Sequence, residues 1–345
     1  APSVNPKYFN TPGQRYDLVR VRYHRSVRAL VTGVSGFVGS HLVDLLRAEH
    51  PEVEVFGLLR WRSEDPERLA LRDVQLLEGD LLDAVSVIRA VGAARPDIVF
   101  HLGASSSVAG SWDAPNEMVQ VNVLGTLHLL EALRVECSTA RVVLACSAEA
   151  YGIVRPEELP IAEDQPFRPV SPYAVSKAAA DLFGFQYNRS YGLHTVRLRL
   201  FNHCGPRQSS RFVVASLARQ VAEIEAGLRA PQILVGNLEV RRDFVDVRDA
   251  VRAYWAAAMA GAPGAAYNVC SGRTHSIREV LHGLLAFSGI TLELVNDPSR
   301  RRPADLEVLH GDASAFRDLT GWTPRIPFEQ TLRDTLEYWR ATVAS

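Results

Sequence analysis

Cysteine is sparse in this sequence, and its few copies are scattered. Cys137, Cys146, Cys204 and Cys270 form no Cys-x-x-Cys pair among the 345 residues. Zinc sites and disulfide frameworks need cysteines at characteristic spacings, so the pattern argues against both, and no metal site is expected. We therefore expect reduced thiols in a cytoplasmic protein.

Long apolar runs are also missing. No hydrophobic stretch approaches the roughly 20 residues that are needed to cross a bilayer. Residues 1–27 are polar, basic and proline-bearing, without the apolar centre of a signal peptide. We expect them to form a loosely ordered N-terminal arm, or alternatively an arm that covers the cofactor or a neighbouring subunit.

An excess of charge of either sign is absent as well. The chain has 38 basic and 39 acidic residues, which leaves a formal net charge of −1. Such a balance gives no reason to expect a nucleic acid or a membrane surface as the main partner. Lysine is scarce and arginine abundant, so any anionic ligand must be held by local arginines.

What the sequence does contain is an alternation of apolar runs and helical patterns from Arg28 onward. We expect strands at 28–33, 53–59, 74–80, 97–104, 141–147 and 194–202 and helices at 35–50, 87–94, 115–136 and 172–191. Nearly continuous apolar strands between helices are typical of a parallel sheet covered on both faces. The predicted fold class is α/β, a doubly wound, Rossmann-like sheet whose ligands bind beyond the carboxyl ends of the strands.

The sequence pattern changes after Asn202. Glycines and prolines cluster at GPRQSS, GAPGAA and RRPADLEV, and the strand–helix cycle no longer repeats cleanly. We predict a dinucleotide-binding domain over 28–202 that carries the catalytic residues. Residues 203–345 are expected to form mainly a smaller α+β substrate-binding lobe, with some segments returning to the first domain.

A glycine-rich turn follows the first expected strand. Glycines at this spacing permit a tight turn, the close approach of a pyrophosphate, and close helix–strand packing, while the helix N-terminus offers N–H groups to phosphates. An ordinary strand–helix turn is the alternative, but the position in the first βα unit favours a dinucleotide site. The expected cofactor-binding residues of this turn are Gly33, Ser35, Gly36, Phe37, Val38 and Gly39.

The residues after the second strand bear on which dinucleotide is bound. Arg60, Arg62 and Ser63 stand where an acidic residue would select a free ribose hydroxyl, and arginine suits an additional 2′-phosphate. A solvated basic loop is the alternative reading. We predict NADP, with NAD possible. Asp80 follows the third strand and either accepts from the adenine amino group or caps a helix.

Polar residues gather between Cys146 and Lys177. Ser147 and Glu149 emerge where an apolar run ends, and Pro172 opens a helix that carries Tyr173 and Lys177 four residues apart, on one face. A nearby ammonium favours the phenolate form of a tyrosine, which would let Tyr173 exchange protons nearer neutral pH. These four side chains are the predicted catalytic residues.

Several motifs together resemble the extended short-chain dehydrogenase/reductase family. They are TGVSGFVG, HLGASSSV, NVLGTLHLLEA, CSAEAYG and YAVSK. Within that family, LLRWRS, FNHCGPRQ, GNLEVRRDFVDVRDAVRAYW, YNVCSG and GWTPRIP look most like the enzymes that act on GDP-mannose and its 4-keto-6-deoxy product. The resemblance runs from about Arg28 to Arg340.

The resemblance implies a 4,6-dehydratase reaction. The cofactor would take hydride from C4 while Tyr173 takes the hydroxyl proton, with Ser147 on the 4-oxygen and Lys177 on the nicotinamide ribose. Glu149 would remove the C5 proton and assist loss of the C6 hydroxyl as water, and hydride would return to C6. Many 4,6-dehydratases have threonine in place of Ser147, and related 4-keto reductases also carry a glutamate at the position of Glu149, which would then only orient substrate.

The same resemblance supplies the remaining candidates. Further cofactor contacts are implied for Leu81, Leu102, Gly103 and Ala104. Substrate contacts are implied for Ser105, Ser106, Ser107, Asn122, Glu149, Asn202, Arg211, Phe212, Arg242 and Arg302. Asn122 could instead make a hydrogen bond at a helix kink, and Arg242 and Arg302 could form surface ion pairs.

Four functions stay open at this point. The leading one converts GDP-mannose to GDP-4-keto-6-deoxy-mannose, and the alternative is an NADPH-dependent reductase of that ketone. A nucleotide-sugar 4-epimerase is disfavoured because it needs no base at C5, and a non-catalytic NADP-binding regulator is disfavoured by the intact Tyr173–Lys177 pair. The expected partners are a GDP-linked sugar and a second copy of the chain, as a homodimer or tetramer.

Overall fold

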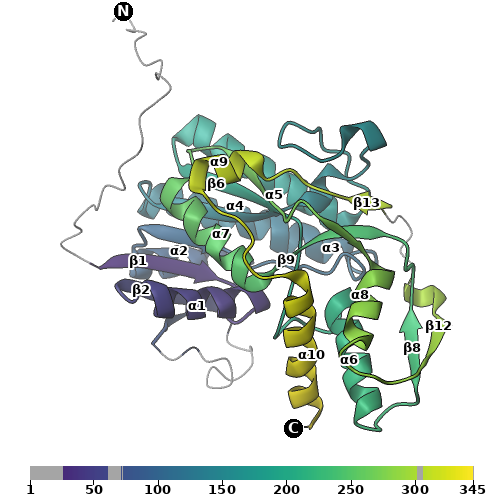
Figure 1. The fold of residues 1–345 in the computed structure, drawn as a ribbon. Helices are drawn as coiled ribbons and strands as arrows, with labels where there is room; N and C mark the ends of the chain where they lie inside the picture. Colours follow the sequence, from purple (N-terminus) through teal and green to yellow (C-terminus); the bar gives the residue numbers. More distant parts are fainter. Residues whose placement is uncertain (1–25, 61–70, 72, 301–305, 345) are drawn as a thin grey trace, which may run out of the picture.

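The computed structural model describes residues 26–60, 71, 73–300 and 306–344 (Figure 1). Its elements in chain order are β1 (Val27–Thr32), α1 (Phe37–Glu49), β2 (Val53–Leu59), β3 (Gln75–Glu78), α2 (Ala84–Ala94), β4 (Ile98–His101), α3 (Pro115–Glu117), the π-helical η1 (Met118–Leu124), α4 (Gly125–Glu136), β5 (Arg141–Ser147), the 3₁₀ turns η2 (Ala148–Tyr151) and η3 (Pro156–Glu158), α5 (Pro172–Tyr191), β6 (His194–Leu200), β7 (Asn202–Cys204), α6 (Val213–Glu225), β8 (Gln232–Val235), β9 (Arg241–Asp246), α7 (Val247–Ala260), β10 (Ala266–Val269), β11 (Thr274–Ser276), α8 (Ile277–Leu285), β12 (Glu293–Asn296), the 3₁₀ turn η4 (Pro298–Arg300), β13 (Val308–Leu309), α9 (Ser314–Thr320) and α10 (Phe328–Ala344).

The centre of the molecule is a parallel sheet of seven strands. Its order is β10-β6-β5-β4-β1-β2-β3, and every neighbouring pair is parallel. From β1 the chain first builds outward through β2 and β3, then crosses to β4 on the other side of β1. The order therefore reverses between β1 and β4, and ligands of doubly wound sheets bind at such a reversal.

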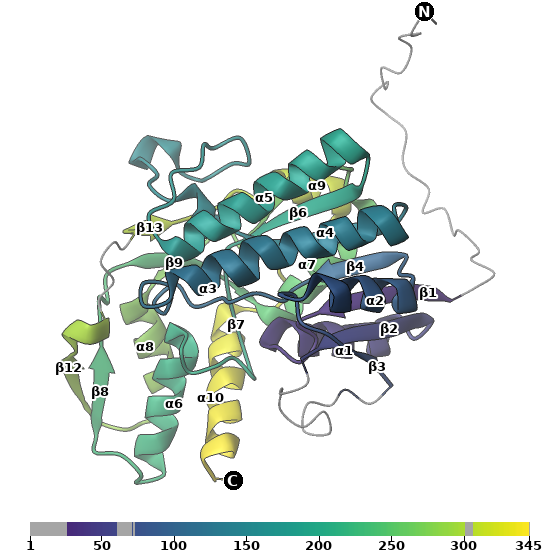
Figure 2. The same ribbon diagram turned by 180° about the vertical axis from the view of Figure 1, so that it is seen from behind.

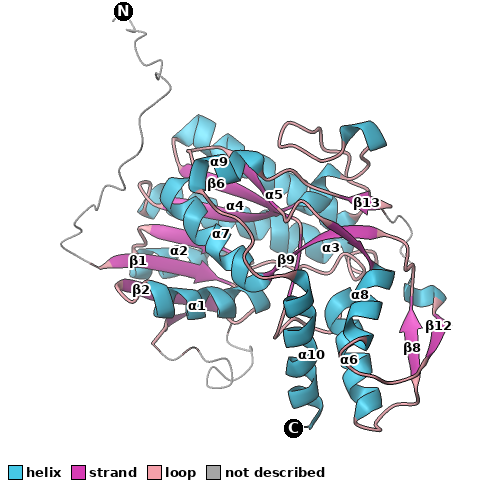
Figure 3. Cartoon of the chain, in the orientation of Figure 1, coloured by secondary structure: helices cyan, strands magenta, loops and turns pink. Residues whose placement is uncertain are grey.

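Helices cover both faces of this sheet. Figure 1 shows α1 and α7 in front of it, and Figure 2, from behind, shows α2, α4 and α5 on the opposite face. Figure 3 shows the same layering by element type. The doubly wound, Rossmann-like fold predicted from the sequence is confirmed.

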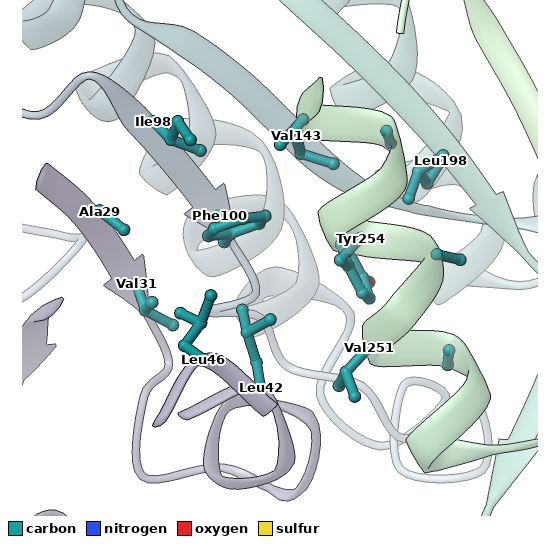
Figure 4. Packing of buried hydrophobic residues seen from close by; sticks show 14 of the residues in the cluster. Ala29, Val31, Leu42, Leu46, Ile98, Phe100, Val143, Leu198, Val251 and Tyr254 are labelled. Atoms are coloured by element: carbon teal, nitrogen blue, oxygen red, sulfur yellow. The ribbon is translucent and has the colours of Figure 1, made fainter. Parts of the chain in front are cut away.

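The strands contribute side chains to two hydrophobic cores, because successive side chains point to opposite faces of the sheet. Ala29 and Val31 of β1 join one core with Leu42 of α1 and Tyr254 of α7, as the close view in Figure 4 shows. Leu30, between them in sequence, belongs to the other core, beneath α2 and α4. All five side chains are almost completely buried. This two-sided burial explains why the strands read as continuous apolar runs.

The second half of the chain contributes to two regions. Helices α6, α8 and α10 pack around a core of their own beside the paired strands β8 and β12, at the lower right of Figure 1. In contrast, β10 and α7 return to the large sheet, where β10 pairs with β6. In a third sheet, β9 pairs with β7, β11 and β13.

The helix expected at 115–136 is interrupted. Residues Met118–Leu124 are π-helical, and the N–H of Gly125 bonds to the carbonyl of Gln120, five residues back. Such turns concentrate at functional sites because they re-aim one side chain. Across the residues described, no helix has the length and apolar character that crossing a membrane requires.

Candidate functional site

A cleft of about 480 Å³ opens at the carboxyl ends of the sheet strands. It brings together most of the residues singled out from the sequence. Those that line it are Gly33, Ser35, Gly36, Phe37, Val38, Gly39, Arg60, Asp80, Leu81, Leu102, Ala104, Ser105, Ser106, Ser107, Ser147, Glu149, Tyr173, Lys177, Asn202, Arg211 and Phe212. Gly103, Asn122 and Arg242 do not line it, and Arg62, Ser63 and Arg302 lie outside the described residues.

The glycine-rich turn has the backbone that a dinucleotide site requires. Gly33 has φ of +68°, and a Cβ there would lie 2.8 Å from the backbone of Gly103. A Cβ on Gly39 would lie 2.3 Å from the carbonyl oxygen of Gly33, so only glycine lets α1 approach the turn this closely. Gly36 is the N-cap of α1, and no side chain caps that terminus. The N-terminal N–H groups are thus available to phosphate, and the turn fits a dinucleotide.

The next two cofactor candidates lie at the ends of β2 and β3. Arg60 is exposed at the cleft. Asp80 also lines the cleft, but its Oδ1 accepts the N–H of Leu82 at 2.9 Å, while Asp83 caps helix α2. The helix-cap alternative for Asp80 was therefore wrong, because the helix begins three residues later than that reading requires.

Helix α5 fixes the tyrosine and the lysine. Ser171 is its N-cap, with its side chain accepting from the N–H of Ala174 at 3.1 Å, and Pro172 occupies the first turn. Tyr173 and Lys177 follow one turn apart and are 9% and 7% exposed. Nζ of Lys177 donates to the carbonyl oxygen of Ala145 at 2.8 Å, which ties the helix to the end of β5.

The electrostatics of this pair differ from the expectation. Burial raises the pKa of Tyr173 to about 12, the hydrogen bond with Ser147 lowers it, and the charge of Glu149 raises it. Burial also lowers the pKa of Lys177. The protein alone therefore keeps Tyr173 as a neutral phenol, because desolvation of the phenolate outweighs the stabilisation expected from the lysine.

Ser147 and Glu149 are held together at the end of β5. Oγ of Ser147 accepts the N–H of Glu149 at 3.2 Å and caps the short turn η2. The other end of that turn is fixed by Tyr151, whose hydroxyl donates to Oδ1 of Asn268 at 2.7 Å. Nη1 of Arg199 donates to the same hydroxyl at 3.0 Å. Glu149 thus stands on a rigid support with its carboxylate close enough to influence Tyr173.

Two predicted substrate residues occupy other places. Arg242 is 4% exposed, and its Nη1 donates to the carbonyl oxygens of Arg241 and Leu306. Asn122 is 1% exposed and lies behind the cleft, where its amide bonds to Ser105 and to Ser176 of α5. Both roles in substrate binding stay predictions.

Residues of the segment after β6 line the cleft without having been expected there. They include Phe201, His203 and Gln208. The His203 ring stacks on Phe37 of the cofactor turn, with centroids 6.0 Å apart and planes 4° from parallel. Burial lowers the pKa of His203. The FNHCGPRQ motif was the available signal, but its spacing alone does not show which side chains face the cleft.

Comparison with known proteins adds relatives for this geometry. The family model described as GDP-mannose 4,6 dehydratase matches residues 30–335. A GDP-6-deoxy-D-mannose reductase from Pseudomonas aeruginosa is 38% identical over 316 residues, which cover 92% of this chain and 98% of that protein. GDP-mannose 4,6 dehydratase 2 from Arabidopsis thaliana is 33% identical over 322 residues, which cover 88% of this chain and 84% of that protein.

Two solved structures share the fold over nearly the whole chain. The structure of RMD from Pseudomonas aeruginosa complexed with NADPH superposes with a TM-score of 0.78 and 35% identity, covering 92% of this chain and 100% of that one. The UDP-glucose 4-epimerase of Thermus thermophilus in complex with NAD has a TM-score of 0.82 and 35% identity, covering 91% of this chain and 99% of that one.

Proposed function

Because this chain belongs to the GDP-mannose 4,6-dehydratase family of extended short-chain dehydrogenases/reductases, we propose that it acts on C4 of a GDP-linked hexose with NADP(H) as cofactor. The glycine turn and Arg60 support the cofactor assignment, together with the NADPH of the Pseudomonas neighbour. NAD remains an alternative cofactor, since the epimerase neighbour is complexed with it. A cytoplasmic location stays a prediction.

The reaction that the site geometry favours is 4,6-dehydration of GDP-mannose. The observation that carries this proposal is Glu149, a carboxylate in the cleft beside Tyr173 on a firmly anchored turn. Abstraction of a proton from C5 requires a base in addition to the tyrosine, whereas reduction or epimerisation at C4 does not.

The chain's own residues then have separate tasks. Ser147 donates a hydrogen bond to the sugar 4-oxygen. Tyr173, as the phenolate that the positive charge of a bound oxidised nicotinamide would favour, takes the proton of the 4-hydroxyl as the ketone forms. Glu149 accepts the C5 proton and passes a proton to the departing C6 hydroxyl, which leaves as water. Glu149 is then a carboxylate again, and the proton that Tyr173 took is finally delivered to C5 as hydride reaches C6, so that each residue ends the cycle as it began. A bound nicotinamide would take hydride from C4 and return it to C6.

The second candidate is reduction of GDP-4-keto-6-deoxy-mannose. It is favoured by the Pseudomonas reductase, which is 38% identical and matches this chain in length. In that reaction Tyr173 donates a proton to the 4-oxygen as the ketone is reduced, and Glu149 only orients the sugar.

One pair of assays separates the candidates. The enzyme is incubated with GDP-mannose and a trace of NADP⁺, and separately with the 4-keto-6-deoxy sugar and excess NADPH. A dehydratase yields a product lighter by one water from the first mixture, measured by mass spectrometry. A reductase leaves GDP-mannose unchanged and consumes NADPH stoichiometrically in the second mixture. No turnover in either mixture would refute both candidates.

Glu149→Gln provides the matched test of the residue that carries the proposal. We expect it to abolish water loss from GDP-mannose, since a carboxamide cannot accept the C5 proton. Tyr173→Phe is the positive control for loss of both reactions. If Glu149→Gln dehydrates GDP-mannose at the wild-type rate, the assigned role of the carboxylate is wrong.

We also propose that the chain forms a homodimer through η1, α4 and α5. Helices α4 and α5 lie side by side in Figure 2, and η1 contacts both of them. These helices carry a set of exposed apolar side chains, namely Val119, Leu124, Val135, Val175, Leu182, Phe185 and Tyr191. Apolar surface of this extent on a monomer marks an interaction site. Light scattering should give a dimeric mass that Leu182→Glu reduces, and a monomeric wild type would refute the proposal.

A further inference from the structure

A row of buried polar side chains runs from the cofactor turn to the catalytic helix. His101 ends β4 and is paired in the sheet with Thr32, which ends β1. Nδ1 of His101 lies 2.8 Å from Oγ1 of Thr32, and Nε2 lies 3.0 Å from Oγ1 of Thr126. None of the three residues is more than 6% exposed. Their hydrogen bonds must therefore be satisfied within the protein and not by solvent.

The hydrogen positions in this row follow from counting donors. Thr126 donates its hydroxyl hydrogen to the carbonyl oxygen of Asn122 at 2.6 Å. A hydroxyl has one hydrogen, so Thr126 must accept from His101, and Nε2 carries the hydrogen. Nδ1 is then the acceptor for Thr32, which itself accepts the N–H of Gly103 at 3.0 Å. The reverse order would leave two oxygens 2.6 Å apart with no hydrogen between them.

The charge state of His101 agrees with this order. Burial, and to a smaller extent the charge of Lys177, lowers the pKa of His101 to about 3. An imidazolium would have to lie in the protein interior and be repelled by the charge of Lys177. The ring is therefore neutral throughout the physiological pH range.

The row continues into the catalytic helix through Asn122. Its Oδ1 accepts the N–H of Ser105 at 2.8 Å, and its Nδ2 donates to the carbonyl of Ser105 and to Oγ of Ser176, both at 2.9 Å. Ser176 donates to the carbonyl oxygen of Tyr173 at 2.7 Å. Both amide hydrogens and the amide oxygen are used, and the π-helical turn η1 places Asn122 where it can reach both sides.

We propose that His101, as a neutral imidazole with its hydrogen on Nε2, is a positioning residue that holds the cofactor turn at Gly103 and the Tyr173–Lys177 helix in one fixed register. Each link accepts from the link before it and donates to the next, so the row transmits position from the turn to the tyrosine. Its kinetic consequence rests on the proposed function, because register matters for proton and hydride transfer at one carbon. The tautomer does not depend on that function.

The kinetic test compares two threonines that make the same local bond. Thr126→Val removes the hydroxyl that links His101 to Asn122. Thr335→Val removes an equally buried hydroxyl in α10 that donates to the carbonyl of Thr331 at 2.7 Å but touches no histidine. We expect Thr126→Val to lower kcat by about 10- to 100-fold, with KM for the nucleotide sugar changed less than about threefold. Thr335→Val should leave both constants unchanged.

A wild-type kcat for Thr126→Val would overturn the positioning role. So would an equal loss in both variants, because that would be a general effect of removing a buried hydroxyl. A higher KM at unchanged kcat would also contradict it, since it would mean that the row serves binding alone.

The tautomer is tested on the wild-type protein without any turnover. Long-range proton–nitrogen correlation spectra of histidine-labelled protein distinguish a protonated Nε2 from a protonated Nδ1, and the His101 signals are those missing from His101→Phe. We expect the Nε2–H form from about pH 5 to about pH 8. An Nδ1–H form or an imidazolium in that range would overturn the proposal even if Thr126→Val fails to fold.

Discussion

The closest backbone approach at the glycine turn makes Gly39→Ala an informative substitution. A Cβ at residue 39 would lie 2.3 Å from the carbonyl oxygen of Gly33 and 2.8 Å from Cα of Val34. These are backbone atoms at the end of a buried strand, so they cannot rotate away as a side chain would. Helix α1 would have to move by about 1 Å to restore ordinary contact.

Gly92→Ala is the matched control, because it makes the same chemical change inside helix α2. The nearest atom to its new Cβ would be Oε2 of Glu136 at 3.6 Å, an ordinary contact. Alanine is a better helix former than glycine, so Gly92→Ala should raise the free energy of unfolding by about 0.5–1 kcal/mol. Gly39→Ala should lower it by about 1–3 kcal/mol, as overpacking does.

The assay measures stability and cofactor binding separately. Urea unfolding, followed by the fluorescence of the five tryptophans, gives the free energies of the two variants without any ligand. Titration with NADPH gives the affinity, which we expect Gly39→Ala to weaken about tenfold or more, because the phosphate-binding N–H groups move with the helix. If Gly39→Ala gains stability as Gly92→Ala does, or binds NADPH like the wild type, the reasoning from close packing is refuted.

Three further predictions concern buried charges. Asp181→Ala should lower the free energy of unfolding, measured by urea titration, by about 3–5 kcal/mol. Asp181 is completely buried, and its removal would leave its two arginine partners on β6 without a counter-charge. Lys177 should titrate below the ordinary lysine pKa of 10.5 because it is buried. Selective lysine labelling gives only two NMR signals to follow, those of Lys177 and Lys7. An ordinary pKa for Lys177 would contradict the effect of burial. His41 has a pKa lowered to about 4 by burial, so as the pH falls from about 6.5 to about 4 the unfolded chain binds a proton that the folded chain does not, and stability should fall by up to about 1.4 kcal/mol per pH unit. Because His101 contributes a slope of the same sign, His41→Gln should reduce the slope in urea midpoints without abolishing it, whereas His282→Gln, at an exposed position, should leave it unchanged.

Local signals predicted much of the fold. The strands at 53–59 and 141–147 and the helix at 172–191 have the expected bounds. For the helix the reasons are local: Ser171 and Pro172 start it, and Gly192 ends it with φ of +72°. Such signals lie within a few residues of the boundary that they set.

Features that depend on distant partners were not specified in this way. The short strand β10 is recognisable only by its pairing with β6, some 70 residues earlier in the chain. The π-helical turn around Asn122 depends on Ser105 and Ser176, which the surrounding sequence NVLGTLHLL does not reveal. Periodicity describes one segment at a time and therefore cannot show either feature.

The site residues also fall into those that local signals place and those that distant contacts place. The turn glycines, Ser147 and Tyr173 are placed by the ends of regular elements, and the structure brings them together in one cleft. His203 reaches the cleft because β7 pairs with β9, a contact across the lobes. Arg242 is buried and donates to the carbonyl oxygen of Leu306, and neither arginine of the RRDF pair lines the cleft, which the motif alone does not reveal.

Strand β10 limits how this enzyme can be divided or recombined. A fragment that stops at Asn202 would leave the β6 edge from Arg197 to Leu200 unpaired, and bare strand edges promote aggregation. A substrate lobe borrowed from a relative would therefore have to be supplied in two pieces, one between β6 and α7 and one after β10, with α7 and β10 kept from the host. The chain crosses between the lobes more than once, so the second lobe is not attached through a single linker.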